Sequence, residues 1–336
     1  MVQVSRRTVT LALVCAPLSA VAPMTAVADP QAQRGVRTIS ARIPLGVPRP
    51  LDPRWMRLQS LGYGAAPSEL GTSEGGEGLF WGPGYGVQVP DTSWWYADAA
   101  KRRLAHYGDS GEFLGQAELP GEHLPQGYFQ WANPMALADG TVVLTSTTID
   151  SAALLLHSPS QGFRRVELAR PMNIVVGDGV FLYGFDDENR RVRLDPETGD
   201  IRESPAFGGQ GGRLFIIDVD DAITVTRPGV KVRLELFSRD YPGATVHPQL
   251  EAVMGADGRL WILLTGIVEV SAGIIRTVVG LIWIHDRGQM SPVYRVRVPT
   301  SASDPGDGHH LGIRHGDSRP TLMFVDATAV RVYRRG

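Results

Sequence analysis

The feature that most constrains the fold is a motif that occurs twice, 88 residues apart, beginning at Asp98 and at Asp186. In each copy the Asp ends an apolar run, an Arg and an aliphatic residue follow five and six positions later, and a Gly follows at position thirteen. Weaker copies fill the same spacing, at Met135–Leu144, Phe215–Phe237, Val253–Arg297 and Leu311–Tyr333. The spacing of 88 residues corresponds to two repeats of 44 residues. A sequence period of this length is typical of propellers and solenoids.

Each unit is predicted to form four strands, with the Asp ending the second strand and the Arg lying on the third. The 39 glycines and 24 prolines supply many turns. Branched and aromatic residues at alternate positions need cover on both faces of such a sheet, and radial stacking provides it. We therefore predict an all-β fold, a six-bladed β-propeller.

The two ends of the chain indicate how the ring is joined. Thr321–Val325 and Ala329–Arg335 are predicted as strands, and no fourth strand follows them. Val36–Leu45 is an isolated strand before the first unit. We expect this N-terminal strand to pair with Ala329–Arg335 and so to close the ring through the C-terminal blade.

Residues 1–28 have the pattern of a cleaved signal peptide. Arg6 and Arg7 precede an apolar stretch, and Ala26-Val27-Ala28 fits the cleavage site. The paired arginines predict twin-arginine export, with the general secretory route as the alternative. We expect residues 29–336 to form one secreted propeller domain. The single cysteine, Cys15, lies in the signal, so the mature chain has no thiol for a disulfide or a metal.

Charge and hydropathy exclude several classes of partner. The net charge is −2 and the charges are dispersed, which argues against nucleic acid. The apolar segment Leu260–Ile284 contains Glu269 and Arg276, and it fits two strands joined at Ser271-Ala272-Gly273 better than a membrane span. We therefore expect no transmembrane anchor after signal cleavage, and a monomer.

The units at Asp98 and Asp186 resemble the NHL repeat, although Lys101 stands where Asn is usual and Asp195 where an aromatic residue is usual. The resemblance implies that the Asp and the Arg brace the second strand against the third. It therefore assigns a scaffold role to Asp98, Arg103, Asp186 and Arg191. NHL-type propellers include binding modules, amidating lyases and lactonase-like hydrolases, so the fold alone does not select a function.

Histidines in the predicted loops between blades are candidates for a metal site. Loops that join an outer strand to the next inner strand meet on one face, at the mouth of the channel. Those loops contain His123, His247, His309 and His310. Three imidazoles there would hold a zinc with an open position, and the resemblance to amidating lyases implies a metal held by histidines of separate blades. The alternatives are exposed loop histidines, or a calcium site built from Glu74, Glu77, Asn133, Asn173, Asp220 and Asp304.

Two aromatic segments precede predicted inner strands and are expected at the same mouth. Their aromatic residues are Phe80, Trp81 and Tyr85 in the first, and Tyr128, Phe129 and Trp131 in the second. Such rings stack on a sugar, a peptide or a flat metabolite, or they plug the channel. The leading hypothesis is an exported propeller that binds a small molecule, a glycan or a protein partner there. The alternative is a metal-dependent lyase or hydrolase, and metal analysis of the mature protein distinguishes the two.

Overall fold

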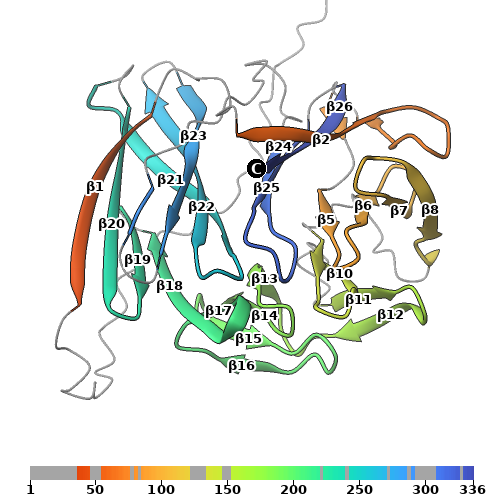
Figure 1. Ribbon diagram of the computed structural model, residues 1–336, viewed down its shortest axis with the longest axis horizontal. Coiled ribbons are helices and arrows are strands. Elements are labelled where there is room, and N and C mark those ends of the chain that lie inside the picture. Colours follow the sequence, from red (N-terminus) through yellow and green to blue (C-terminus); the bar gives the residue numbers. More distant parts are fainter. Residues whose placement is uncertain are drawn as a thin grey trace, which may run out of the picture. The chain divides into compact units, whose positions relative to one another are not determined.

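The strands of the structure, a computed structural model, follow one another along the chain in small sheets (Figure 1). The structure describes residues 36–45, 54–75, 79–81, 85–121, 134–145, 153–219, 222–238, 242–270, 273–285, 289–291, 308–325 and 328–336. Val36–Gly336 forms one compact unit. The predicted signal peptide, residues 1–28, lies outside the described residues and stays a prediction.

Six of the sheets described contain three to five strands each, and they confirm the all-β propeller. Blades 1 to 3 are β5–β8 (Gly86–Gln88, Trp94–Asp98, Arg103–Tyr107, Phe113–Glu118), β9–β12 (Met135–Ala136, Val142–Thr145, Ala153–Ser158, Gly162–Glu167) and β13–β16 (Met172–Gly177, Leu182–Asp186, Arg191–Leu194, Ile201–Glu203). Blade 4 is β17–β20 (Phe207–Gly209, Arg213–Val219, Ile223–Arg227, Val230–Ser238) with β1 (Arg37–Leu45). Blade 5 is β21–β23 (Thr245–Met254, Leu260–Val270, Gly273–Ile284), and blade 6 is β24–β26 (Gly308–Gly312, Thr321–Val325, Ala329–Arg335) with β2 (Trp55–Gly62). Asp98 and Asp186 end the second strands of blades 1 and 3, so the predicted repeat is confirmed.

Strand β6 shows why the blades pack against one another. All five of its residues are buried, and successive side chains face opposite neighbours, as the period of two in a strand requires. Trp94 and Tyr96 pack with Met323 and other residues of blade 6, whereas Trp95 packs with Leu144 and other residues of blade 2. Further clusters join blades 2 and 3, blades 3 to 5, and blades 5 and 6. The series of shared clusters therefore returns to the first blade.

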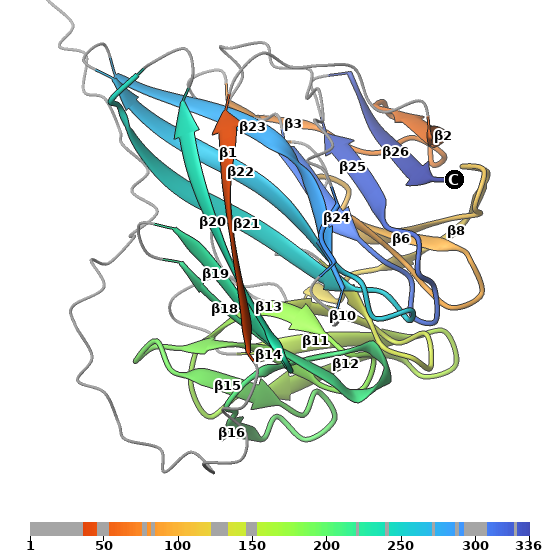
Figure 2. The same ribbon diagram turned by 60° about the vertical axis from the view of Figure 1, so that its left-hand side comes forward.

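An N-terminal strand does pair with the C-terminal blade, but it is not the predicted one. β2 lies antiparallel to β26, from Trp55 opposite Arg335 to Gly62 opposite Ala329. β1 instead lies parallel to β20 at the edge of blade 4 (Figure 2). The expectation that Val36–Leu45 pairs with Ala329–Arg335 is wrong. The reason is that Ile43 of β1 is buried in the core cluster of blades 3 to 5, whereas Leu61 of β2 is buried between blades 6 and 1.

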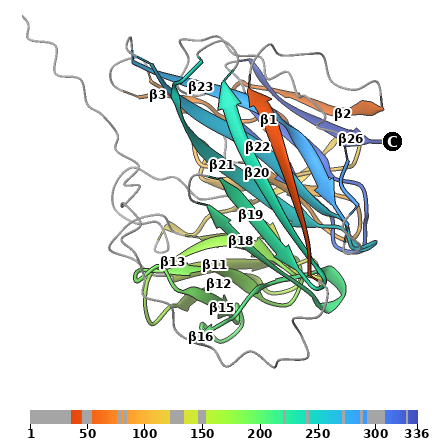
Figure 3. The same cartoon turned by 90° about the vertical axis from the view of Figure 1, so that its left-hand side faces the viewer.

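The segment tested for a membrane span is a β-hairpin, as predicted. Strands β22 and β23 pair along their length, from Leu260 opposite Ile284 to Val270 opposite Gly273 (Figure 3). Among the described residues, no helix is long and apolar enough to cross a membrane.

The buried acid–base pair of the repeat holds blade 1 together. Asp98 and Arg103 lie opposite each other on β6 and β7, and Nε of Arg103 donates to Oδ2 of Asp98 at 2.9 Å. Both side chains are almost fully buried. Asp98 also accepts from the backbone N–H of Gly71, and Arg103 donates to the backbone oxygen of Pro67 at 2.7 Å. The pair thus braces β6 against β7, as the resemblance implies, and it also fixes the segment between β2 and blade 1.

The corresponding pair in blade 3 is not Asp186 with Arg191. Asp186 binds Arg190 and Arg170, at 2.9 and 3.0 Å, and Arg191 binds Asp218. The turn after Asp186 is one residue shorter than the turn after Asp98, so the backbone partner of Asp186 is Arg190. Arg191 lies opposite Phe185 on the neighbouring strand, so its side chain does not bind Asp186. The prediction that Arg191 pairs with Asp186 is therefore wrong, because Arg191 binds Asp218.

A buried polar network joins blade 6 to blade 1, and we call this junction the seam. Gln59 of β2 is almost fully buried; its Nε2 donates to the backbone oxygen of Gly108 at 2.8 Å, and its Oε1 accepts from the hydroxyl of Tyr96. Arg334 of β26 donates to Oε1 of Gln88 at 2.7 Å and to Oδ1 of Asp109 at 3.1 Å. These bonds satisfy polar groups that burial would otherwise leave unpaired.

We predict that replacing Gln59 with Leu lowers the free energy of unfolding by about 2 to 4 kcal/mol, because the hydroxyl of Tyr96 and the carbonyl of Gly108 lose their partner. Tyr96→Phe should cost about 1 kcal/mol. The double variant should be more stable than the sum predicts, since both changes remove the same bond. Urea denaturation measures all three, with the exposed Ser60→Ala as the control. Additive costs would contradict the shared bond.

Candidate functional site

The structure describes only some of the aromatic residues that were predicted at the channel mouth. Phe80 and Trp81 do not lie in a loop, because Leu79–Trp81 is strand β4 and pairs with β3 (Ser73–Gly75). The side chains of Phe80 and Trp81 lie outside the described residues, and so do Tyr128, Phe129 and Trp131. Tyr85, directly before β5, is the member of the set whose contacts the structure describes.

Tyr85 meets one of the predicted metal histidines. Its ring stacks on His310 of β24, with centroids 4.9 Å apart. Nδ1 of His310 lies 3.0 Å from Oε2 of Glu251 on β21, and the same oxygen accepts from the N–H of Leu311 at 2.7 Å. These residues lie on or next to the first strands of blades 1, 6 and 5. Residues distant in the sequence therefore come together at the inner strands, as the propeller predicts.

The other predicted metal ligands are not gathered around His310 in the part of the chain that the structure describes. His247 lies exposed on β21. His309 occupies a position on β24, but its side chain lies outside the described residues, as does all of His123. Within the described residues, no three His, Cys, Asp or Glu side chains could hold a metal ion together. The zinc and calcium hypotheses stay predictions.

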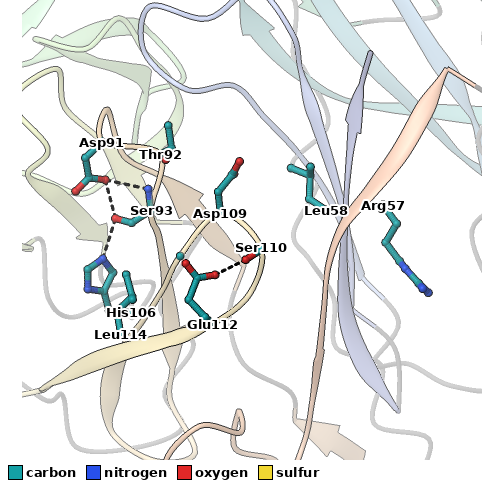
Figure 4. Close-up of a pocket in the computed structure, with 11 residues that line it drawn as sticks. Arg57, Leu58, Asp91, Thr92, Ser93, His106, Asp109, Ser110, Glu112 and Leu114 are labelled. Atoms are coloured by element: carbon teal, nitrogen blue, oxygen red, sulfur yellow. Dashed lines mark hydrogen bonds between the residues drawn. The ribbon is translucent and has the colours of Figure 1, made fainter.

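A cavity of about 510 Å³ lies at the seam, and we call it the seam cleft (Figure 4). It is lined by Arg57, Leu58, Asp91, Thr92, Ser93, His106, Gly108, Asp109, Ser110, Glu112 and Leu114. Its volume falls in the range of small-molecule sites, about 300 to 1,000 Å³.

The seam cleft lies at the end of blade 1 opposite the predicted mouth. Its turns are 91–93, between β5 and β6, and 108–112, between β7 and β8. Antiparallel strands place both turns at one end of the blade. The turn from β6 to β7 and the C-terminal end of β8 lie at the other end, where the mouth was predicted. Sequence reasoning therefore missed this site.

Three backbone irregularities converge on the seam cleft. Leu58 is the extra residue of a β-bulge in β2, between the pairs formed by Arg57 and Gln59. Leu114 is the extra residue of a second bulge, in β8. Thr92 has φ +78°, a left-handed conformation that is unusual for a β-branched residue. Bulges and strained residues are concentrated at functional sites, where they direct particular side chains.

The polar side of the cleft is a chain of hydrogen bonds that ends at a carboxylate. Oγ of Ser93 donates to Oδ1 of Asp91 at 2.7 Å, so Nε2 of His106, 2.8 Å from the same Oγ, acts as the donor to it. The ring of His106 stacks on Trp95, with centroids 4.1 Å apart and an angle of 3° between the planes. In a serine hydrolase the carboxylate orients the histidine. Here Asp91 accepts from Ser93 itself, which favours a binding site over an activated nucleophile.

Protonation states follow from these contacts. Partial burial alone would raise the pKa of Asp91, but the hydrogen bonds from Ser93 Oγ–H and N–H hold it below the usual value. The hydrogen bond from Ser110 likewise lowers the pKa of Glu112. Burial lowers the pKa of His106, against the opposing effect of Asp91. At neutral pH Asp91 and Glu112 are therefore carboxylates, and His106 is a neutral imidazole.

The same histidine belongs to an aromatic stack between blades 1 and 2. Trp95 lies between His106 and His157 of β11, whose ring centroid is 4.7 Å away. His157 is 5% exposed, and its Nδ1 has no hydrogen-bond partner among the residues that the structure describes. Both histidines lie on strands, His106 on β7 and His157 on β11.

One family model matches the chain over residues 53–335, that of a domain of unknown function, DUF7485. The chain belongs to this family. Similar solved structures include virginiamycin B lyase from Staphylococcus aureus, with 13% identity and a TM-score of 0.47, over 84% of this chain and 99% of that one. Regucalcin, a calcium-binding protein from Agrobacterium tumefaciens, has 12% identity and a TM-score of 0.40, over 89% and 97%. No curated protein matches in sequence. Function in this member of DUF7485 therefore has to be argued from its own residues.

We predict that the free energy of unfolding falls as the pH decreases from 7.5 to 5. Burial holds the pKa of His106 and of His157 below the usual 6.5, so the unfolded chain binds more protons than the folded one as the pH drops below that value. His157→Phe keeps a ring against Trp95 and removes one titrating group. Its stability should therefore fall less as the pH decreases in urea titrations, whereas the exposed Val180→Ala, which changes no titrating group, should follow the parent. Parallel curves for parent and His157→Phe would refute the assignment.

Proposed function

We propose that this DUF7485 protein is an exported propeller that binds a small ligand in the seam cleft. The observation that carries the proposal is the convergence of two bulged leucines and the left-handed Thr92 on one cavity of ligand size. Irregular backbone costs about 1 to 3 kcal/mol at a residue such as Thr92. A ligand site at this turn would explain why the protein keeps the strained conformation of Thr92.

The lining defines the kind of ligand. Leu58 is half-buried and Leu114 is 54% exposed, and each offers an aliphatic side chain to the seam cleft. Asp91 and Glu112 offer carboxylate oxygens, which accept hydrogen bonds. A matching ligand has an aliphatic part beside groups that donate hydrogen bonds. The ligand class matches the small-molecule binding expected from the sequence, but the proposed seat is the seam rather than the channel mouth.

Leu114→Ala should weaken the binding of such ligands about tenfold, because each buried CH₂ group contributes about 0.8 kcal/mol. The measurement is a fragment screen by ligand-observed NMR, followed by titration of the hits. Leu214→Ala is the matched control, since Leu214 is a similarly exposed strand leucine, in blade 4. Hits that bind both variants equally well would place the ligand elsewhere and overturn the proposal.

Export rests on residues 1–28 alone. We expect a chain expressed with its own leader and recovered outside the cytoplasm to begin at Asp29, as measured by mass spectrometry of the intact protein. An uncleaved N-terminus on the recovered protein would contradict the predicted signal peptide.

A further inference from the structure

The charges of the seam cleft are not balanced by the protein. Of its three carboxylates, Asp109 is paired with Arg334 at 3.1 Å. Asp91 and Glu112 are hydrogen-bonded to serine hydroxyls, and among the described residues neither forms an ion pair with Lys or Arg. Two anionic groups of one cavity are therefore left for a ligand.

The other charged or titratable residues of the lining do not neutralise them. His106 is held neutral by burial and gives its Nε2–H to Ser93. Figure 4 shows the side chain of Arg57 directed away from Asp91 and Glu112, on the other side of β2 from Leu58. The potential of the cleft is thus set by two carboxylates beside an aliphatic surface.

A bare divalent cation does not suit this lining. Calcium takes about six to eight oxygen ligands, whereas the lining here includes the aliphatic side chains of Leu58 and Leu114. An alkyl chain with a terminal ammonium group suits both sides, because its methylenes cover leucine while its three N–H groups reach oxygen acceptors.

Building on the proposed function, we infer that the ligand of the seam cleft carries a primary ammonium group on an alkyl chain. The ammonium lies at Asp91 and Glu112, and the chain lies on Leu58 and Leu114. A free alkylamine and the side chain of a lysine share this chemistry.

The test compares probes of one shape and different charge. n-Pentylamine should bind the full mature protein about tenfold more tightly than n-pentanol, since hydrogen bonds assisted by charge are about twice as strong as neutral ones. Pentanoate should not bind. The preference should shrink as salt is raised, because the carboxylates are exposed. Nα-acetyl-lysine amide, run in parallel, shows whether a lysine side chain is taken as well as a free amine.

Charge-removing variants locate the ammonium. Asp91→Asn keeps the oxygen that accepts from Ser93, and Glu112→Gln changes an exposed side chain; each should reduce n-pentylamine binding to the level of n-pentanol. The matched controls are Asp187→Asn, an exposed carboxylate in blade 3, and Glu118→Gln, at the far end of β8. Both controls should bind as the parent does. If Asp91→Asn does not fold, Glu112→Gln alone decides the outcome.

The remaining outcomes separate the two proposals. If n-pentylamine and n-pentanol bind equally well, and Leu114→Ala weakens both, the seam cleft is still a ligand site. The inference that its ligand carries an ammonium group is then wrong. Calcium binding that is lost in Asp91→Asn would also overturn it, in favour of a metal. No binding of any probe, together with fragment hits insensitive to Leu114→Ala, would overturn the seam cleft itself.

Discussion

The pairing of β2 with β26 is the contact on which the rest of the structure depends. It brings residues 55–62 and 329–335 into one sheet and completes the blade that faces blade 1. One strand then serves three purposes in successive residues. Leu58 lines the seam cleft, Gln59 bonds to the 108–109 turn, and Leu61 packs in the shared core. Because these residues are adjacent, the shape of the cleft is tied to the register that joins the two ends.

The repeat was predictable because blades obey simple rules of alternation. Buried residues such as Trp94 and Trp95 alternate between two neighbouring sheets, and that pattern is visible in the sequence. The joining strand was not predictable in the same way. The bulge at Leu58 breaks the period of two in β2, whereas Val36–Leu45 looks like a regular strand. Turn length decided the partner of Asp186, and a motif that counts positions from the Asp does not register a turn that is one residue shorter.

The functional residues were likewise predictable only in part. Sequence reasoning placed Tyr85 and His310 at one mouth because both adjoin inner strands, and they do stack on each other. It did not find the seam cleft, because that cavity is assembled from β2, two turns of blade 1 and β8. Each contributor alone resembles an ordinary turn or strand. A bulge leaves no signature in a single sequence, so the exposure of Leu114 follows only from the paired register.

Three hydrogen bonds fix the short turn that carries Asp91, between β5 and β6. Val89 donates to Ser93 O, Thr92 donates to Val89 O, and Gln88 Nε2 donates to Thr92 O, all within 2.8 to 3.0 Å. Gln88 is in turn bound by Arg334 of the joining sheet. These bonds hold Thr92 in its left-handed conformation, and they hold the carboxylate of Asp91 in place without a ligand. A site ordered in advance loses less conformational entropy on binding, so the polar network at the seam serves recognition as well as stability.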